Sequence, residues 1–216
     1  MRLDLRVYVI TDRTFRGRSH EDVARAALVG GATVVQLRDK QASGRELVQW
    51  ARQLRALTRR ARATFVVNDR VDVALAAEAD GAHVGEDDLP VADARRLLGP
   101  DRVVGASAGT VEEALRAQAD GADYLGVGPV FPTATKPDAG GAIGPEGLRR
   151  IVEAVRIPVV GIGGITLDNA AEVIRAGAAG VAVISAVAAA DDMVEATRRL
   201  REVVDAALQE RGGAER

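Results

Sequence analysis

The sequence contains no cysteine, and that absence excludes several kinds of chemistry at once. Structural disulfides, thiolate nucleophiles, and zinc or iron–sulfur sites built on cysteine all need a residue that this chain does not have. Histidine is scarce as well, because His20 and His83 are the 2 copies, and neither lies at a clear strand end. We therefore expect no covalent intermediate between the protein and a ligand.

An excess of charge of one sign is also lacking, since 29 lysines and arginines stand against 31 aspartates and glutamates. Without a basic block the chain offers no surface for nucleic acid, although a local cradle could still hold one small phosphate ester. No apolar run approaches membrane-spanning length, and charges interrupt the first residues, MRLDLRVYVITD, where a signal core would lie. We expect a cytoplasmic protein with no nucleic-acid or membrane partner.

What the chain does have is an alternation of short Val- and Ile-rich runs with longer segments of helical period, which is typical of βα units around a parallel sheet. The predicted strands are Val7–Thr11, Val34–Arg38, Thr64–Asn68, His83–Gly85, Val103–Ser107, Tyr124–Val127, Pro158–Ile162 and Val181–Ile184. The predicted helices are about Glu21–Val29, Arg45–Ala61, Val71–Ala79, Val91–Leu98, Val111–Ala119, Pro145–Val155, Leu167–Arg175 and Asp192–Leu208. The pattern predicts an α/β protein with a single (β/α)₈ TIM barrel domain over residues 1–209, followed by a polar tail, 210–216, that frays.

A weak internal repeat supports this count, because glycine and alanine close several of the predicted helices just before a strand. Glycine there is expected to adopt the left-handed conformation that ends a helix. In a barrel these turns lie at the end away from the ligand site, so we assign them no functional role. The pairs are Gly31-Ala32, Gly81-Ala82, Gly121-Ala122 and Gly177-Ala178.

Polar side chains accumulate where the predicted strands end, which is the ligand-binding face of a barrel. Strand alternation directs Gln36 and Arg38 to the same side. Taken singly, Asp69 could be a helix N-cap, and the acidic run after the fourth strand could be a solvated loop. Their coincidence at one rim favours a binding site. The residues concerned are Thr11-Asp12-Arg13, Gln36 to Lys40, Asn68-Asp69-Arg70, Glu86-Asp87-Asp88 and Ser107.

The segment Tyr124–Gly144 begins as an apolar strand and continues as the longest irregular stretch of the chain. It holds Lys136 behind Thr133 and Thr135, so an ammonium, hydroxyls and backbone donors could form an anion cradle. A loop of this length is usually either functional or disordered, and a mobile surface loop is the alternative interpretation.

Glycines also follow the predicted seventh strand, and Ser185 follows the eighth. Barrels commonly bind a phosphate group between the loops after these two strands, on backbone N–H groups and the positive end of a helix. Gly163 and Gly164 would let the backbone come close to such a group. The alternative is a glycine turn with nothing bound.

Several stretches together resemble the thiamine-phosphate synthase family, also called thiamine-phosphate pyrophosphorylase. GIGGIT alone is shared by many phosphate-binding barrels, whereas QLRDK, the ND pair and FPTATK in this order are specific. The resemblance implies the Mg²⁺-dependent condensation of hydroxymethylpyrimidine diphosphate with a thiazole phosphate, through a pyrimidine carbocation, to thiamine phosphate and pyrophosphate. The matching stretches cover nearly the whole chain: VYVITD, VQLRDK, VNDRVDVALAAEADGAHVGEDDLP, GASAGTVEEA, LGVGPVFPTATK, GIGGIT and VAVISA.

The same resemblance implies roles for individual residues. Magnesium, which takes one or two carboxylates and fills its octahedron with water and phosphates, would be held by Asp69 and Asp88. Catalytic roles against the charge of the departing pyrophosphate fall on Lys136, Arg38, Lys40 and Ser107. The pyrimidine diphosphate site is implied to comprise Gln36, Leu37, Arg38, Asp39, Lys40, Asn68, Ser107 and Lys136. The thiazole phosphate site is implied to comprise Thr133, Ala134, Thr135, Gly164, Ile184 and Ser185.

Two further functions stay open beside the synthase: a thiazole tautomerase, which is an isomerase on the same barrel, and a phosphate-binding barrel without turnover. A tautomerase has no use for the full set of carboxylates and cations, which favours the synthase. His83 is expected to be a satisfied core or rim side chain, and His20 to lie in a helix-capping context after Ser19. Glu86 stands where the family often has Gln. Whether the thiazole carries a carboxylate, and whether the barrel forms a homo-oligomer, also stay open.

Overall fold

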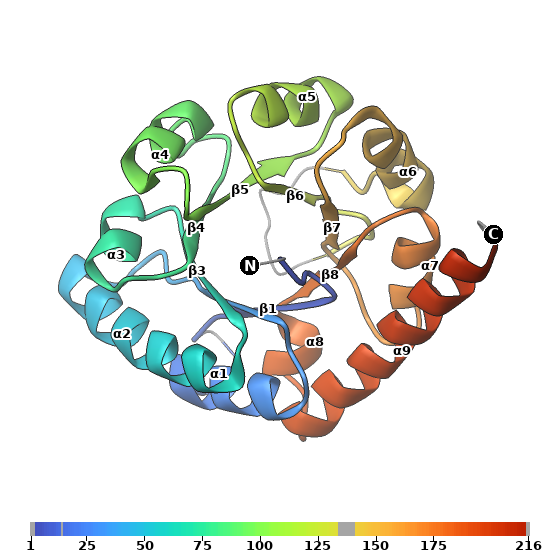
Figure 1. Ribbon diagram of the computed structural model, residues 1–216. Helices are drawn as coiled ribbons and strands as arrows, with labels where there is room; N and C mark the ends of the chain where they lie inside the picture. Colours follow the sequence, from blue (N-terminus) through green and yellow to red (C-terminus); the bar gives the residue numbers. More distant parts are fainter. Residues whose placement is uncertain (1–2, 14, 134–140, 215–216) are drawn as a thin grey trace.

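Eight parallel strands close into a barrel in the order of the sequence, so that β1 pairs with both β2 and β8 (Figure 1). The computed structural model describes residues 3–13, 15–133 and 141–214. This architecture confirms the predicted TIM barrel. The strands are β1 Val7–Thr11, β2 Val34–Leu37, β3 Thr64–Asn68, β4 Gly81–Val84, β5 Val103–Ala108, β6 Tyr124–Val127, β7 Val159–Ile162 and β8 Gly180–Val183.

The helices surround the barrel as an outer ring (Figure 1). Two of them begin with a capping box. The side chain of Ser19 or Ser43 accepts a hydrogen bond from the backbone N–H three residues on, and the side chain of that later residue accepts one from the backbone N–H of the serine. A short helix after β8, α8, is not predicted, because four residues show no helical period. The helices are α1 His20–Val29, α2 Gly44–Ala61, α3 Val71–Ala76, α4 Val91–Leu98, α5 Val111–Ala119, α6 Gly144–Ala154, α7 Ala170–Arg175, α8 Ser185–Ala188 and α9 Met193–Ala214.

The strands are buried on both faces, as the central strands of a parallel barrel must be. Residues facing outward, such as Val9 and Phe65, pack with the helices in one large core. Residues facing inward form a second core inside the barrel, which includes Tyr8, Val66 and Tyr124. Two tyrosine hydroxyls are therefore placed in the barrel interior, immediately beneath the ends of the strands.

One of the predicted glycine turns is wrong. Gly31, Gly121 and Gly177 have positive φ angles and end their helices as expected, whereas Gly81 is the first residue of β4. There a Cβ atom would lie 2.0 Å from the carbonyl oxygen of Val103, so the requirement for glycine comes from the close approach of β5. As a result β4 begins two residues earlier than predicted and places His83 within the strand.

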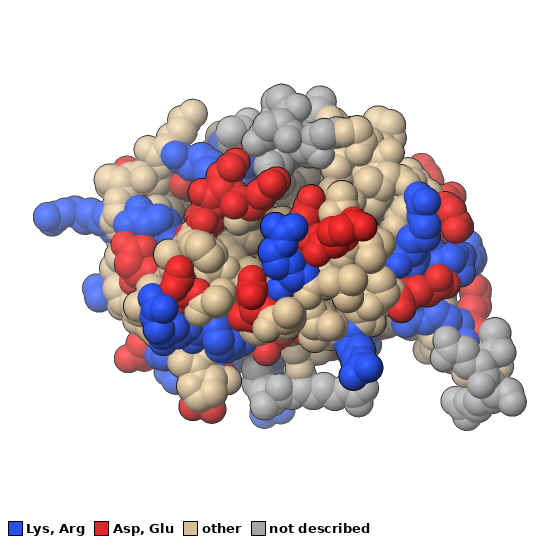
Figure 2. Space-filling model, turned by 90° about the horizontal axis from the view of Figure 1, so that it is seen from above, with Lys and Arg blue, Asp and Glu red and all other residues tan. Residues whose placement is uncertain are grey.

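The last helix is longer than predicted, because α9 continues past Leu208 to Ala214. Arg211 donates hydrogen bonds to the carbonyl oxygens of Ile174 and Ala178, and Glu210 pairs with Arg175, which ties this end to α7. No described helix is long and apolar enough to cross a membrane. On the face seen in Figure 2, acidic and basic side chains are interspersed, in keeping with the net charge of -2.

A candidate active site at the carboxyl ends of the strands

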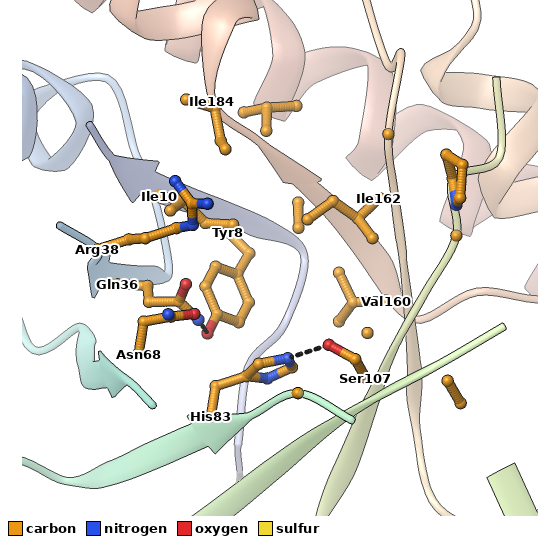
Figure 3. A pocket seen from close by; sticks show the side chains of 18 of the residues that line it. Tyr8, Ile10, Gln36, Arg38, Asn68, His83, Ser107, Val160, Ile162 and Ile184 are labelled. Carbon is orange, nitrogen blue, oxygen red and sulfur yellow. Dashed lines mark hydrogen bonds between the residues drawn. The ribbon is translucent and has the colours of Figure 1, made fainter. Parts of the chain in front are cut away.

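A cavity of about 440 Å³ opens where the strands end. Polar side chains from β2 to β5, among them Gln36 and Ser107, line one side of it, and aliphatic side chains such as Val160 and Ile184 line the other (Figure 3). A polar wall that faces an apolar wall suits a small molecule with a flat ring and charged substituents.

Two carboxylates meet on the polar side, at the ends of the neighbouring strands β3 and β4. Asp69 has a φ of 60°, a left-handed conformation that Asp tolerates better than most residues, and its N–H donates to the carbonyl oxygen of His83 at 2.8 Å. Asp88 accepts a hydrogen bond from Gly85 N–H at 2.8 Å. Lys40 reaches the pair from the loop after β2, with Nζ 2.5 Å from Oδ2 of Asp69.

The two carboxylates titrate differently because they share this site. Burial and the hydrogen bond with Asp88 raise the pKa of Asp69 to about 6, although Lys40 opposes the shift. Burial alone would raise the pKa of Asp88, but its hydrogen bonds with Asp69 and Gly85 N–H lower it. Two close carboxylates that hold one proton between them form a place where a cation can replace that proton.

This pair fits a hard divalent cation. Among the described residues no cluster of three His, Asp or Glu side chains could ligate a metal, so an all-protein cage is not offered there. Mg²⁺ does not need one, because it is commonly held by one or two carboxylates together with water and substrate phosphates. Asp69 and Asp88 are the residues that could hold it.

Arg38 adds a positive charge to the wall of the cavity that holds these carboxylates. The Arg38 side chain, mostly buried, donates from Nη1 to Oδ2 of Asp12 at 2.9 Å, which fixes the guanidinium at the end of β2. Arg38 lines the cavity together with Lys40 and Asn68. Gln36 and Arg38 thus lie on the same side, as strand alternation predicts, and Lys40 lines the same cavity from the loop after β2.

The intervening residues Leu37, in β2, and Asp39, in the loop after it, lie elsewhere. The Leu37 side chain is buried in the core between strands and helices, and the Asp39 carboxylate faces its own loop. Asp39 accepts hydrogen bonds from the backbone N–H groups of Gln41 and Ala42, and Arg13 Nε lies 2.6 Å from its Oδ2. The structure therefore does not bring the side chains of Leu37 and Asp39 to the pyrimidine diphosphate site expected from the resemblance.

The turn after β7 lies against the start of the loop after β6. Gly163 and Gly164 have positive φ angles, and a Cβ atom on Gly164 would lie 2.5 Å from the carbonyl oxygen of Pro132. Thr133, Gly164, Ile184 and Ser185 accordingly line the same cavity. The remaining residues expected there, Ala134, Thr135 and Lys136, lie outside the described residues.

Sequence reasoning missed three aromatic residues of the cavity. Tyr8, His83 and Tyr124 all line it, and they connect Gln36 to Ser107 through hydrogen bonds. The alternation of β1 and β6 places both tyrosines inward. That signal was present in the sequence, but their contact with His83 depends on the register between strands.

The combination of paired carboxylates, cations and glycine turns at the carboxyl end of a (β/α)₈ barrel is typical of enzymes that act on phosphorylated small molecules. A family model described as thiamine monophosphate synthase matches residues 7–187. The chain belongs to the thiamine-phosphate synthase family, and it is a transferase of thiamine biosynthesis.

Individual relatives are similar along nearly their whole length. The thiamine-phosphate synthase of Chloroflexus aurantiacus is 60% identical over 94% of this chain and 94% of its own. That of Moorella thermoacetica is 60% identical over 91% of this chain and 93% of its own. A solved structure of thiamine phosphate pyrophosphorylase from Pyrococcus furiosus is 51% identical, covers 96% of this chain and 98% of its own, and superimposes with a TM-score of 0.89.

Proposed function

We propose that this enzyme joins 4-amino-2-methyl-5-(diphosphooxymethyl)pyrimidine to a thiazole phosphate, giving thiamine phosphate and pyrophosphate. The observation that supports this most is the Asp69–Asp88 pair beside Lys40 and Arg38, because a departing diphosphate needs both a cation and positive side chains. An isomerase acting on the thiazole would need neither.

The diphosphate lies at the polar wall in this proposal. Asp69 and Asp88 would hold Mg²⁺, which would neutralise charge on the phosphate oxygens when bound. Arg38 and Lys40 supply further positive charge, and Ser107 offers a hydroxyl. Lys136, which the family resemblance places at the same group, adds an ammonium from the loop after β6.

The two rings lie between this wall and the aliphatic side chains opposite. In this proposal Gln36 and Asn68 hydrogen-bond the pyrimidine, and Val160 and Ile162, which line the cavity opposite, pack against its flat face. The thiazole phosphate lies on the other side, at Thr133, Ala134, Thr135, Gly164, Ile184 and Ser185.

The reaction exchanges one bond for another. The bond between the pyrimidine methylene carbon and the diphosphate oxygen breaks, and its electron pair leaves with pyrophosphate. The thiazole nitrogen then donates its lone pair to the pyrimidine carbocation and forms the new carbon–nitrogen bond. The chain supplies no nucleophile of its own, and positively charged side chains stabilise the charge that develops on the leaving group.

The test is to incubate the purified protein with both substrates and Mg²⁺ and to quantify thiamine phosphate and pyrophosphate. We expect the two products in equal amounts and none without either substrate. Asp88→Asn should lose most of the turnover, whereas the adjacent exposed Asp87, which does not line the cavity, supplies the matched control Asp87→Asn. Absence of thiamine phosphate from the wild-type reaction would overturn the proposal.

A further inference from the structure

Five residues form one continuous hydrogen-bonded chain across the base of the cavity, from Gln36 through Tyr8, Tyr124 and His83 to Ser107. We propose that this hydrogen-bonded chain couples its two ends, so that Gln36 offers an acceptor to the pyrimidine only when Ser107 offers a donor to the diphosphate. The inference rests on the proposed function for the identity of these two ligand groups. Tyr8, Tyr124 and His83 are then positioning residues, because they act through Gln36 and Ser107.

The contacts of this hydrogen-bonded chain are all within hydrogen-bonding distance. Gln36 Nε2 lies 2.7 Å from the hydroxyl of Tyr8, which lies 2.7 Å from the hydroxyl of Tyr124. His83 joins this group to the cavity, with Nδ1 3.0 Å from the Tyr124 hydroxyl and Nε2 3.1 Å from Ser107 Oγ. Figure 3 shows Gln36 and Tyr8 at one end and His83 and Ser107 at the other.

In such a hydrogen-bonded chain, all donors point toward the same end at any one time. Each tyrosine hydroxyl has a single hydrogen, and a neutral imidazole has a donor on one nitrogen and an acceptor on the other. Gln36 Nε2 can only donate to Tyr8, so Tyr8 donates to Tyr124 and Tyr124 donates to His83 Nδ1. His83 Nε2–H then donates to Ser107, whose own hydrogen is directed to another acceptor. Reversal requires rotation of the Gln36 amide and every bond between.

The direction that follows from the donor at Gln36 Nε2 fits the proposed substrate at both ends. No described residue donates to Oε1 of Gln36, and no described buried side-chain oxygen or nitrogen lacks a partner, so Oε1 is reached from the cavity. It can accept from the amino group of the pyrimidine, while Ser107, exposed to the cavity, donates to a phosphate oxygen. In the reverse direction Gln36 would present N–H to that amino group, and Ser107 would present a lone pair to the anion.

Two glycines make room for this arrangement. The register places Gly105 between His83 on β4 and Tyr124 on β6, and a Cβ atom there would lie 2.2 Å from Tyr124 Cζ. A Cβ atom on Gly126 would lie 3.1 Å from His83 Cε1. Burial raises the pKa of both Tyr8 and Tyr124, so their hydroxyls stay protonated as donors.

The first test reads the direction from the tautomer of His83 and needs no variant. Two-bond ¹H–¹⁵N correlation spectra of histidine-labelled protein separate the two tautomers, and the chain has only 2 histidines. With magnesium pyrophosphate bound, we expect His83 in the Nε2–H form. A spectrum of the Nδ1–H form, of a mixture, or of an imidazolium overturns the proposed direction.

The second test measures the coupling itself by calorimetry, with magnesium pyrophosphate and 4-amino-5-hydroxymethyl-2-methylpyrimidine as probes. In the wild type, each probe should strengthen binding of the other by about fivefold, the lower end of typical coupling between sites. Tyr124→Phe removes one hydroxyl and should abolish the coupling, and Tyr8→Phe should do the same one bond nearer Gln36. Thiazole phosphate binding and the spectrum of His20, which contacts Thr11 and Asp39, should not change.

Retention of the full coupling in both variants overturns the proposal, and so does its absence from the wild type. Neither outcome depends on turnover. A protein that shows the coupling but makes no thiamine phosphate would instead contradict the proposed function, so the two failures can be told apart.

Discussion

Asp69 and Asp88 line one cavity at the ends of the neighbouring strands β3 and β4, and Lys40 Nζ lies 2.5 Å from Oδ2 of Asp69. Burial and the neighbouring Asp88 raise the pKa of Asp69 to about 6, although Lys40 opposes the shift. The site is therefore ready to exchange a proton for a divalent cation, and this property leads to a pH dependence that can be measured.

In the metal-free protein the free energy of unfolding should fall as the pH rises from about 4 to about 6 through the Asp69 contribution. The pKa of Asp69 is about 6 in the folded protein, against an ordinary value of 3.8 for an exposed aspartate, so the folded protein binds the additional proton in this window. Asp69→Asn should remove this contribution, and Asp87→Asn should keep it. Denaturant titrations across the window measure the difference, and parallel profiles for the wild type and Asp69→Asn would contradict it.

Chemical modification of lysine can report on the site, because Lys40 and Lys136 are the 2 lysines of the sequence. The Lys40 side chain is 55% exposed, so an amine-selective reagent can reach it. Magnesium pyrophosphate should slow its modification by about tenfold or more if the ammonium contacts the diphosphate. Mass spectrometry of the labelled peptides gives the rate, and the N-terminal amine serves as an internal control. Equal rates with and without the ligand would remove Lys40 from the site.

Lys136 is assigned to the departing pyrophosphate by the family resemblance. Lys136→Ala should lower kcat by about 10² to 10³, by analogy with loss of one preorganised electrostatic donor, and should raise KM for the pyrimidine substrate less. Steady-state kinetics with both substrates separates these effects. A raised KM with unchanged kcat would show that Lys136 serves binding alone.

Gly105→Ala tests the packing that holds Tyr124. The added Cβ atom would overlap the ring, and we expect a loss of about 1–3 kcal/mol in the free energy of unfolding, as is typical of overpacked cores. Gly109→Ala is the control, because its Cβ atom would meet no atom nearer than 3.6 Å. Equal stability of the two variants would contradict the packing argument.

The sequence predicts most of the fold, because hydrophobic period distinguishes buried strands from the helices around them. Its errors lie where an effect other than periodicity decides. The sequence predicts a turn at Gly81, whereas the structure requires glycine there because β5 lies too close for a Cβ atom. The helix α9 continues past residue 209, where Arg211 donates hydrogen bonds to carbonyl oxygens of neighbouring segments. Neither contact is visible before the elements are packed.

Part of the candidate site can likewise be predicted from periodicity, and part depends on how the strands pair. The common side of Gln36 and Arg38 follows from strand alternation, and the same rule turns Leu37 away. Asp39 and Lys40 lie in the loop after β2, where strand alternation no longer applies. The contact of Tyr124 with His83 requires the register of β4, β5 and β6 and the missing side chain of Gly105 between them. A single sequence contains no such register, which is why His83 was expected to be only a core or rim side chain.

The central claim is that the Asp69–Asp88 pair is the diphosphate site, and equilibrium binding of pyrophosphate tests it most directly. We predict that calorimetry with the wild type and with Asp87→Asn shows binding that requires Mg²⁺, and that Asp88→Asn weakens it by about 10-fold to 100-fold, the range typical of altered metal sites. Pyrophosphate binding of equal strength in all three proteins, or binding that does not respond to Mg²⁺, would contradict this account.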